Sequence, residues 1–288
     1  MLDQAFLDRL DALKLHMHHP STGGAGGLRR SKALGSSVEF SDFREYAAGD
    51  DIRRVDWNAY ARFDRLFLKL FMEEQEAHVH VIVDASRSML FGEPNKWETA
   101  VKLAQTISYL ALAGNDRVTL YALQGEKFTA TRPLAGRQGY LAATEFLEGI
   151  SIGKATALSA SVPRLPIAKG RGMSILLSDF LSRDGYEVAL SSLQYRKQEV
   201  TALQILSEQE RNPLMEDAVR LVDSETGEAL EILAGYDTMR RYRNVVEEFI
   251  ESLRKYCYQS SMGYALLNTE ADFENIMLRE LMRAGLLS

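Results

Sequence analysis

An aspartate and two serines at alternate positions, Asp84, Ser86 and Ser88, are the residues of this chain best suited to chemistry. They follow the apolar run 79–83, which predicts a buried strand of a parallel sheet. In α/β proteins, ligands bind at the carboxyl ends of such strands. Because one carboxylate and two hydroxyls present hard oxygens to a single point, the motif indicates a Mg²⁺ site.

Two further segments carry oxygen ligands at matching places in the chain. Thr156 lies in a loop just before a predicted helix, and Asp179 ends the apolar run 174–179. The strand-end loops of a parallel sheet share one edge, so we expect the three segments to converge there. Each piece also has a purely structural interpretation, because Ser86, Ser88 or Thr156 could cap the helix that follows it. Such capping is compatible with metal binding.

The spacing of apolar residues predicts the elements that must position these groups. Strands and helices alternate from residue 78 to residue 206, which predicts a parallel, doubly wound sheet. A hairpin, a long helix, a short strand and a terminal helix are expected after it, and an amphipathic helix and a glycine-rich connector precede the sheet. The expected strands are 78–84, 117–123, 128–132, 174–179, 200–206 and 263–267, the hairpin is 218–232, and the helices are 2–17, around 100–111, 140–150, 158–168, 185–196, 237–258 and 272–284.

The order of Asp-x-Ser-x-Ser, then Thr156, then Asp179 resembles the metal-ion-dependent adhesion site of von Willebrand factor A-like domains. The resemblance implies that Ser86, Ser88 and Thr156 supply hydroxyl ligands, directly or through water. It implies that Asp84 and Asp179 fix coordinated waters around Mg²⁺ or Mn²⁺, and that an acidic residue of a partner protein fills the open position. The chain departs from the pattern at Arg87, a cation beside the serines, and at Phe180, where many such domains carry glycine.

A second and longer resemblance precedes the sheet. Residues 28–76 are similar to the signature of the bacterial family called domain of unknown function 58, which joins such a block to a von Willebrand A-like domain. The resemblance covers about residues 28–286 and implies an adaptor that works with a MoxR-type AAA+ ATPase to remodel, activate or insert cofactors into client proteins. The matching residues are Glu39-Phe40-x-Asp42-x-Arg44-x-Tyr46, Gly49-Asp50-Asp51-x-Arg53-x-x-Asp56-Trp57, Ala61-Arg62 and Leu66-x-x-Lys69.

The expected fold is therefore α/β: a von Willebrand factor A-like Rossmannoid, doubly wound and mostly parallel sheet with an N-terminal extension and an inserted β-hairpin. The expected divisions are 1–27 (helix and connector), 28–76 (arginine- and acid-rich block) and 77–288, with the hairpin insert at about 212–234. Three interpretations of the block stay open. Its Arg–Asp pairs could fix it to the sheet, or it could form a docking surface beside the metal. Nucleic-acid binding is the third, and the nearby acidic residues argue against it because they would cancel the positive field.

The composition and net charge of the chain reduce the number of function classes to consider. The formal net charge of −6 argues against a nucleic-acid binder. No apolar run approaches the roughly 20 residues that span a bilayer, and the start of the chain is unlike a secretory signal. The single cysteine, Cys257, fits a reducing cytoplasm and is interpreted as a packed residue, with a reactive thiol as the alternative.

The predicted function is metal-dependent protein binding by a chain that is not an enzyme. The alternative is a Mg²⁺-dependent hydrolase of phosphoesters, although the sequence offers no clear general base or nucleophile. A scaffold with an unused site is a third interpretation. Nucleotide binding at 148–156 is rejected, because Ala155 stands where a phosphate-binding loop needs Ser or Thr.

Overall fold

The computed structural model describes residues 3–11, 13, 15, 38–47, 50–73, 77–153, 155, 157–213, 218–222, 229–233 and 236–287. They belong to two compact units, one of residues 1–19 and 77–288 and one of residues 20–76. Thr156 and the glycine-rich connector lie outside the described residues. No helix among the described residues has the length and apolar character needed to cross a membrane.

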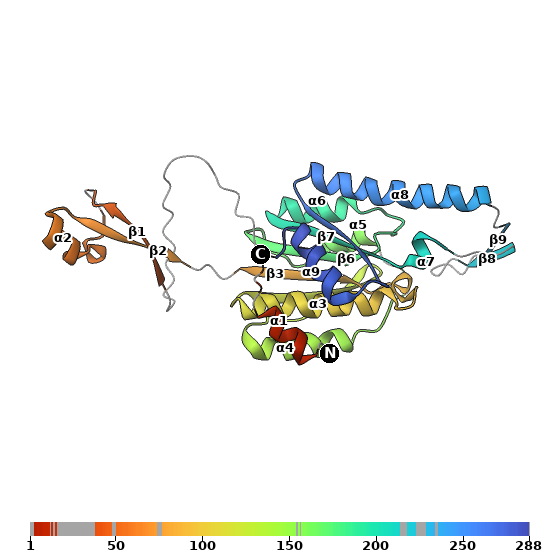
Figure 1. Ribbon diagram of the computed structural model, residues 1–288, viewed down its shortest axis with the longest axis horizontal. Coiled ribbons are helices and arrows are strands. Elements are labelled where there is room, and N and C mark those ends of the chain that lie inside the picture. Colours follow the sequence, from red (N-terminus) through yellow and green to blue (C-terminus); the bar gives the residue numbers. More distant parts are fainter. Residues whose placement is uncertain are drawn as a thin grey trace. The chain divides into compact units, whose positions relative to one another are not determined.

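The larger unit is built on a mostly parallel sheet (Figure 1). In the described part of the chain its strand order is β10-β7-β6-β3-β4-β5, and only β5 runs antiparallel to its neighbour. The inner strands are buried on both faces, which explains their continuous apolar runs. The predicted fold class is confirmed. The strands are β3 (His78–Asp84), β4 (Arg117–Gln124), β5 (Lys127–Ala130), β6 (Gly172–Ser178), β7 (Gln198–Leu206) and β10 (Gly263–Asn268).

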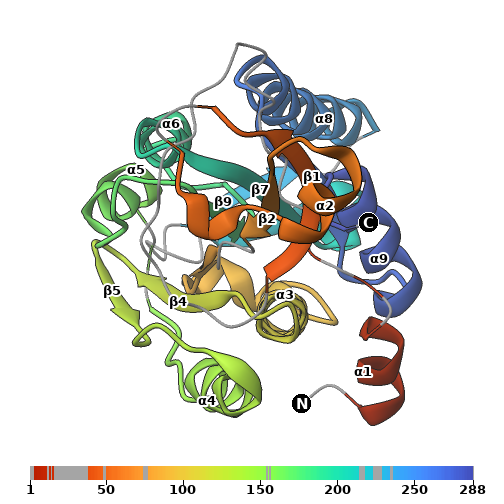
Figure 2. The same ribbon diagram turned by 90° about the vertical axis from the view of Figure 1, so that its left-hand side faces the viewer.

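Helices cover both faces of this sheet (Figures 1 and 2). Neighbouring residues of β3 point to opposite faces, so that Val81 joins one core cluster and Ile82 the other. The first cluster lies under α1 (Gln4–Leu10), α3 (Lys96–Ala113), α4 (Gly136–Glu148) and α9 (Phe273–Arg283), and the second under α5 (Leu158–Ser161), α6 (Glu187–Tyr195) and α8 (Tyr236–Gln259).

Short elements connect these layers at the carboxyl ends of the strands. A 3₁₀ turn, η2 (Arg87–Leu90), follows β3, and the short helix α7 (Glu208–Arg211) follows β7. The predicted hairpin is confirmed as β8 (Ala218–Val222) paired antiparallel with β9 (Ala229–Leu233).

Two predicted helices are wrong in length. The helix expected over 2–17 ends at Leu10, and Leu15 instead forms a bridge with Leu287. The helix expected over 158–168 stops at Ser161 and continues only as the 3₁₀ turn η3 (Val162–Arg164). Proline causes this second difference: Pro163 has no N–H to donate, and the residue before Pro166 is extended, as residues before proline tend to be.

Cys257 on α8 is fully buried, and this burial raises the pKa of its thiol to about 12. A thiolate is the reactive form of cysteine. The interpretation of Cys257 as a packed residue is therefore supported, and a reactive thiol is not.

The smaller unit pairs β1 (Val38–Glu45) antiparallel with β2 (Phe67–Glu73) and carries η1 (Ile52–Arg54) and α2 (Trp57–Phe63) between them. Among its described residues, ion pairs join Arg44 to Asp50 at 2.8 Å and Arg65 to Glu45 at 3.2 Å. Trp57 is 62% exposed, so it is not a core residue of this unit.

Candidate functional site

Two predicted loops meet at the carboxyl edge of the sheet. Asp84 is the last residue of β3, and Asp179 directly follows β6, which pairs with β3 in parallel. The Ser88 hydroxyl donates a hydrogen bond to Oδ2 of Asp179 at 2.7 Å, across 91 positions of sequence. Both carboxylates are only 2% exposed. Four of the five predicted ligands therefore gather at one place, and the fifth, Thr156, lies outside the described residues.

The loop after β3 is ordered by its own aspartate. Asp84 accepts hydrogen bonds from the backbone N–H of Ser86 at 3.0 Å and from the hydroxyl of Ser178 at 2.6 Å. The hydroxyl oxygens of Ser86 and Ser88 are 3.0 Å apart. Ser86 occupies the N-cap position of η2, but its side chain makes no cap hydrogen bond. The capping interpretation of Ser86 is therefore wrong, and its hydroxyl faces Ser88 instead.

The loop after β6 owes its shape to an unusual backbone. Phe180 is buried and has φ of 62°, a left-handed conformation that a bulky residue seldom adopts. The Ser178 hydroxyl accepts a hydrogen bond from the N–H of Phe180 at 2.9 Å, and the Gln204 side chain donates to the carbonyl of Asp179 at 3.3 Å. These contacts hold the conformation in which glycine was expected, so the departure at Phe180 leaves Asp179 directed at the site.

A buried lysine reaches the same carboxylate, and the sequence analysis missed it. Lys96 is the first residue of α3 and is fully buried. Its ammonium donates to Oδ2 of Asp179 at 2.6 Å and also forms an ion pair with Glu210. Arg87, the cation that the sequence singled out, is exposed. The only sequence signal for Lys96 is its place just after Asn95, the N-cap residue of α3.

Glu210 is held by the end of β7. Ser207 and Glu210 form a capping box, in which each side chain accepts a hydrogen bond from the other residue's backbone N–H. Burial works to lower the pKa of Lys96, but the charges of Asp179 and Glu210 and their hydrogen bonds outweigh it, so the pKa lies above its ordinary value. Lys96 is therefore a permanent positive charge beside Asp179.

The donor set fits a small divalent cation. Two oxygen ligands on adjacent corners of a Mg²⁺ octahedron, each about 2.1 Å from the ion, lie about 3.0 Å apart. Ser86 and Ser88 have this separation, which is also that of the hydrogen bond between their hydroxyls. The four described residues offer only oxygen, which Mg²⁺ prefers over nitrogen or sulfur. No cluster of three or more His, Cys, Asp or Glu residues suited to a metal occurs among the described residues, so hydroxyls must contribute to any site here.

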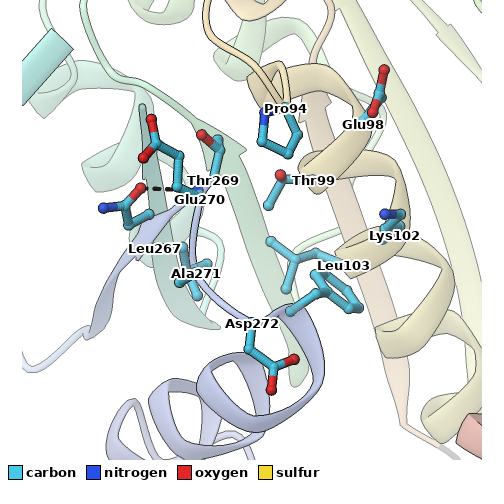
Figure 3. Close-up of a pocket in the computed structure, with 12 residues that line it drawn as sticks. Pro94, Glu98, Thr99, Lys102, Leu103, Leu267, Thr269, Glu270, Ala271 and Asp272 are labelled. Atoms are coloured by element: carbon cyan, nitrogen blue, oxygen red, sulfur yellow. Dashed lines mark hydrogen bonds between the residues drawn. The ribbon is translucent and has the colours of Figure 1, made fainter. Parts of the chain in front are cut away.

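A pocket of about 160 Å³ lies beside this edge, between the first turns of α3 and the segment that joins β10 to α9 (Figure 3). Carboxylates and a lysine surround it, and none of the four described candidate ligands lines it. Asn268, which lines the pocket, donates to Glu208 at 2.8 Å, so a hydrogen bond connects the pocket to α7, the helix that carries Glu210. Its charged lining residues are Glu98, Lys102, Glu270 and Asp272.

The two histidines of β3 lie at its other end. His78 begins the strand and His80 follows two residues later, whereas Asp84 ends it. Their rings stack with centroids 4.2 Å apart, and the Thr119 hydroxyl contacts Nε2 of His78 at 2.8 Å. Burial is the main cause that lowers the pKa of His80 to about 3. Neither histidine is therefore placed to act as a base at the carboxylates.

Comparisons with known proteins find both sequence relatives and solved structures that are similar to this chain. An uncharacterized protein of Mycobacterium tuberculosis is 28% identical over 226 residues, which are 76% of this chain and 70% of that protein. Among solved structures, the conserved hypothetical protein BatB of Bacteroides thetaiotaomicron is 14% identical, with 73% of this chain and 98% of that chain covered at a TM-score of 0.41. The SpRpn10 VWA domain is 9% identical, with 46% and 76% covered at a TM-score of 0.37.

The family comparison is more specific. A pattern described as "Protein of unknown function DUF58" matches residues 42–248, which is more than half of the chain. The matched range includes part of the arginine- and acid-rich block, the strand ending in Asp84 and the loop that carries Asp179. It also includes Lys96 and Glu210. This chain belongs to the DUF58 family.

Proposed function

We propose that this chain is a protein-binding adaptor whose recognition site is the carboxyl edge of β3 and β6. In this proposal Ser86, Ser88 and Thr156 hold Mg²⁺ or Mn²⁺ through their hydroxyls, and Asp84 and Asp179 orient coordinated water. The observation that carries the proposal is the contact of Ser88 with Asp179, because it joins the two loops that a divalent cation would have to bridge.

Contacts among the chain's own residues hold the two loops of the site in place. Asp84 fixes the first loop by accepting from the Ser86 backbone, and Ser178 turns Asp84 toward the second loop. The two serine hydroxyls are neutral, so few negative charges face the cation directly. When bound, the cation supplies an electron-poor position that accepts a carboxylate from another protein. Binding through such a contact breaks no covalent bond.

We infer that the partner is a MoxR-type AAA+ ATPase in the cytoplasm and that the chain adapts it to client proteins. The ATPase partner rests on the resemblance described in the sequence analysis, and the single cysteine, Cys257, fits the reducing cytoplasm. The partner's contact is an acidic side chain in this proposal, because a carboxylate complements a divalent cation that faces two neutral hydroxyls.

Calorimetric titration with Mn²⁺ tests the metal. Wild type is expected to bind one equivalent, and the S86A/S88A double variant to bind at least about tenfold more weakly because two ligands are lost. Ser191 is exposed on α6, where its hydroxyl donates to the carbonyl of Val188 on the same helix, so S191A is the matched control. Equal Mn²⁺ affinity in wild type and S86A/S88A would refute the metal proposal.

Affinity capture from the native host tests the partner. The tagged chain is expected to retain an AAA+ ATPase in Mg²⁺ buffer and to lose it in EDTA, with S191A behaving as wild type. Capture that is unchanged by EDTA and by S86A/S88A would contradict an interaction through the metal. Turnover of phosphoesters by wild type that disappears in D84A would instead favour the hydrolase.

A further inference from the structure

Lys96 is unusual because a lysine at the first turn of a helix normally extends into solvent. Here the whole side chain is buried, and its ammonium lies among carboxylates from two other elements, Asp179 after β6 and Glu210 on α7. A buried ammonium is tolerated only where anions pair with it. Lys96 and its two partners are therefore one charged cluster, built from three separate parts of the chain.

The cluster shares an atom with the candidate metal site. Oδ2 of Asp179 accepts from the Lys96 ammonium at 2.6 Å and from the Ser88 hydroxyl at 2.7 Å. The other oxygen, Oδ1, accepts from the backbone N–H of Leu181 at 3.0 Å. The Asp179 carboxylate therefore pairs with an internal cation, Lys96. It also accepts a hydrogen bond from Ser88, which is a predicted ligand of a second cation.

Lys96 is also held firmly in this position. Its partner Glu210 is fixed by the capping box with Ser207, and the hydroxyl of Tyr242 on α8 donates to the Glu210 carbonyl at 2.7 Å. Gly92, in the loop before α3, packs so closely that a Cβ there would lie 2.6 Å from Cβ of Ser207. Close packing of the loop against α7 therefore restrains the ammonium beside Asp179.

We propose that Lys96 is an internal cation that competes with a divalent cation for Asp179 and thereby lowers the affinity of the site for that cation. The proposal rests on the function proposed above, since it assigns a control to the same site. Its physical basis is that an ammonium against Oδ2 cancels part of the negative charge that would attract a second cation. A partner's carboxylate restores that charge, so tight binding of the cation depends on the partner.

The sharpest test removes the internal cation without changing net charge. The K96M/E210Q double variant deletes one positive and one negative charge together, and Asp179 keeps its other hydrogen bonds. Its affinity for Mn²⁺, measured by calorimetry in the absence of any partner, is expected to be at least about tenfold higher than that of wild type. Lys102 is exposed on the same helix, so K102M is the control and is expected to bind Mn²⁺ as wild type does.

A milder variant keeps the test decisive if the double variant does not fold. E210Q leaves the ammonium with Asp179 as its only charged partner among the described residues, so it strengthens the competition and is expected to weaken Mn²⁺ binding several-fold. E208Q removes a charge two positions away on α7 and serves as the control for a general electrostatic effect. Circular dichroism and thermal melting verify the fold of each variant.

The outcomes separate this inference from the proposed function. Tight Mn²⁺ binding by wild type, unchanged in K96M/E210Q, overturns the role of Lys96 and leaves the metal site standing. Equal binding by E210Q and E208Q also overturns it. No binding by wild type or by any variant overturns both proposals, whereas weak binding by wild type and tight binding by K96M/E210Q supports both.

Discussion

The two ends of β3 bury ionisable side chains in opposite ways. At the carboxyl end, Lys96 keeps its charge because Asp179 and Glu210 surround its ammonium. At the amino end, His80 is almost as buried, but no carboxylate is among the causes that set its pKa, which burial, His78 and Arg196 lower to about 3. One end therefore holds a paired charge and the other holds neutral rings.

This difference teaches where the strand can support chemistry. A paired cluster of charges attracts further charges and responds to them, which suits a binding site. A stacked pair of neutral imidazoles fills space and resists protonation, which suits a core. The following experiments disturb each end in turn, and the largest change in stability is expected at the carboxyl end.

The largest effect is expected from K96M alone. Removing the ammonium leaves the buried Asp179 and the partly buried Glu210 without their cation, and breaking a buried pair in this way typically costs about 3–5 kcal/mol. Urea denaturation at pH 7 measures the loss. K102M removes the same charge from an exposed position of α3 and is expected to change stability by less than about 0.5 kcal/mol. Similar losses in the two variants would mean that the charged cluster contributes little.

A second effect comes from the loop that packs over this cluster. Gly92 has φ of 96°, and a Cβ there would collide with Ser207, so G92A is expected to lose roughly 2 kcal/mol by urea denaturation. Gly170 offers the control, since a Cβ at that position meets nothing within 4 Å. If G92A were as stable as G170A, the loop would not be the constraint on Lys96 that we infer.

At the amino end the expected effect depends on pH. The pKa of His80 is lower in the folded chain than its ordinary value of 6.5, so the unfolded chain binds the proton more readily. The contribution of His80 to the free energy of unfolding is fully present above pH 6.5 and is lost as the pH falls toward 3. The slope is about 1.4 kcal/mol per pH unit, which amounts to roughly 2 kcal/mol between pH 7 and pH 5.

The variant H80F isolates this contribution. Its stability is expected to fall less than that of wild type between pH 7 and pH 5, as measured by urea denaturation at both values. H78F is the matched comparison, because burial lowers the pKa of His78 as well but the side chain is less buried. Identical pH dependence in wild type and H80F would show that His80 is not held neutral by the core.

The carboxyl edge could be predicted from the sequence because each segment that forms it is recognisable from its own residues. Asp84 follows a strand recognisable from its apolar run, and Asp179 follows another, so the rule that parallel strands end at one edge was enough to bring Ser88 and Asp179 together. Helix lengths were less predictable. Leu15 pairs with Leu287 from the other end of the chain, a contact that no local pattern encodes.

Lys96 could not be predicted for the same reason. Its two partners lie 83 and 114 positions away, and a lysine beside an N-cap residue has the pattern of an exposed residue. Arg87 drew attention because it is adjacent in sequence, yet it is exposed. The role of Thr156 as a ligand stays a prediction, as does docking of the arginine- and acid-rich block beside the metal.

The smallest loss of stability is expected from S207A. Ser207 lies beside the loop that carries Gly92, and it caps α7, whose Glu210 pairs with Lys96. The variant loses the side-chain oxygen that accepts from the backbone N–H of Glu210, and losing such a cap typically costs about 1 kcal/mol. S191A on α6 is the control. Because Ser207 positions Glu210 and Glu210 pairs with Lys96, the losses of K96M and S207A should not add.

A double-variant cycle in urea measures that coupling. The K96M/S207A variant is expected to be more stable than the sum of the single losses implies, by at least about 0.5 kcal/mol, because the cap has less to position once the ammonium is gone. Strict additivity would mean that the capping box and the ion pair stabilise α7 independently. In that case Ser207 would not be needed to place Glu210 beside Lys96, and the two ion pairs of the lysine would hold the carboxyl edge without the cap.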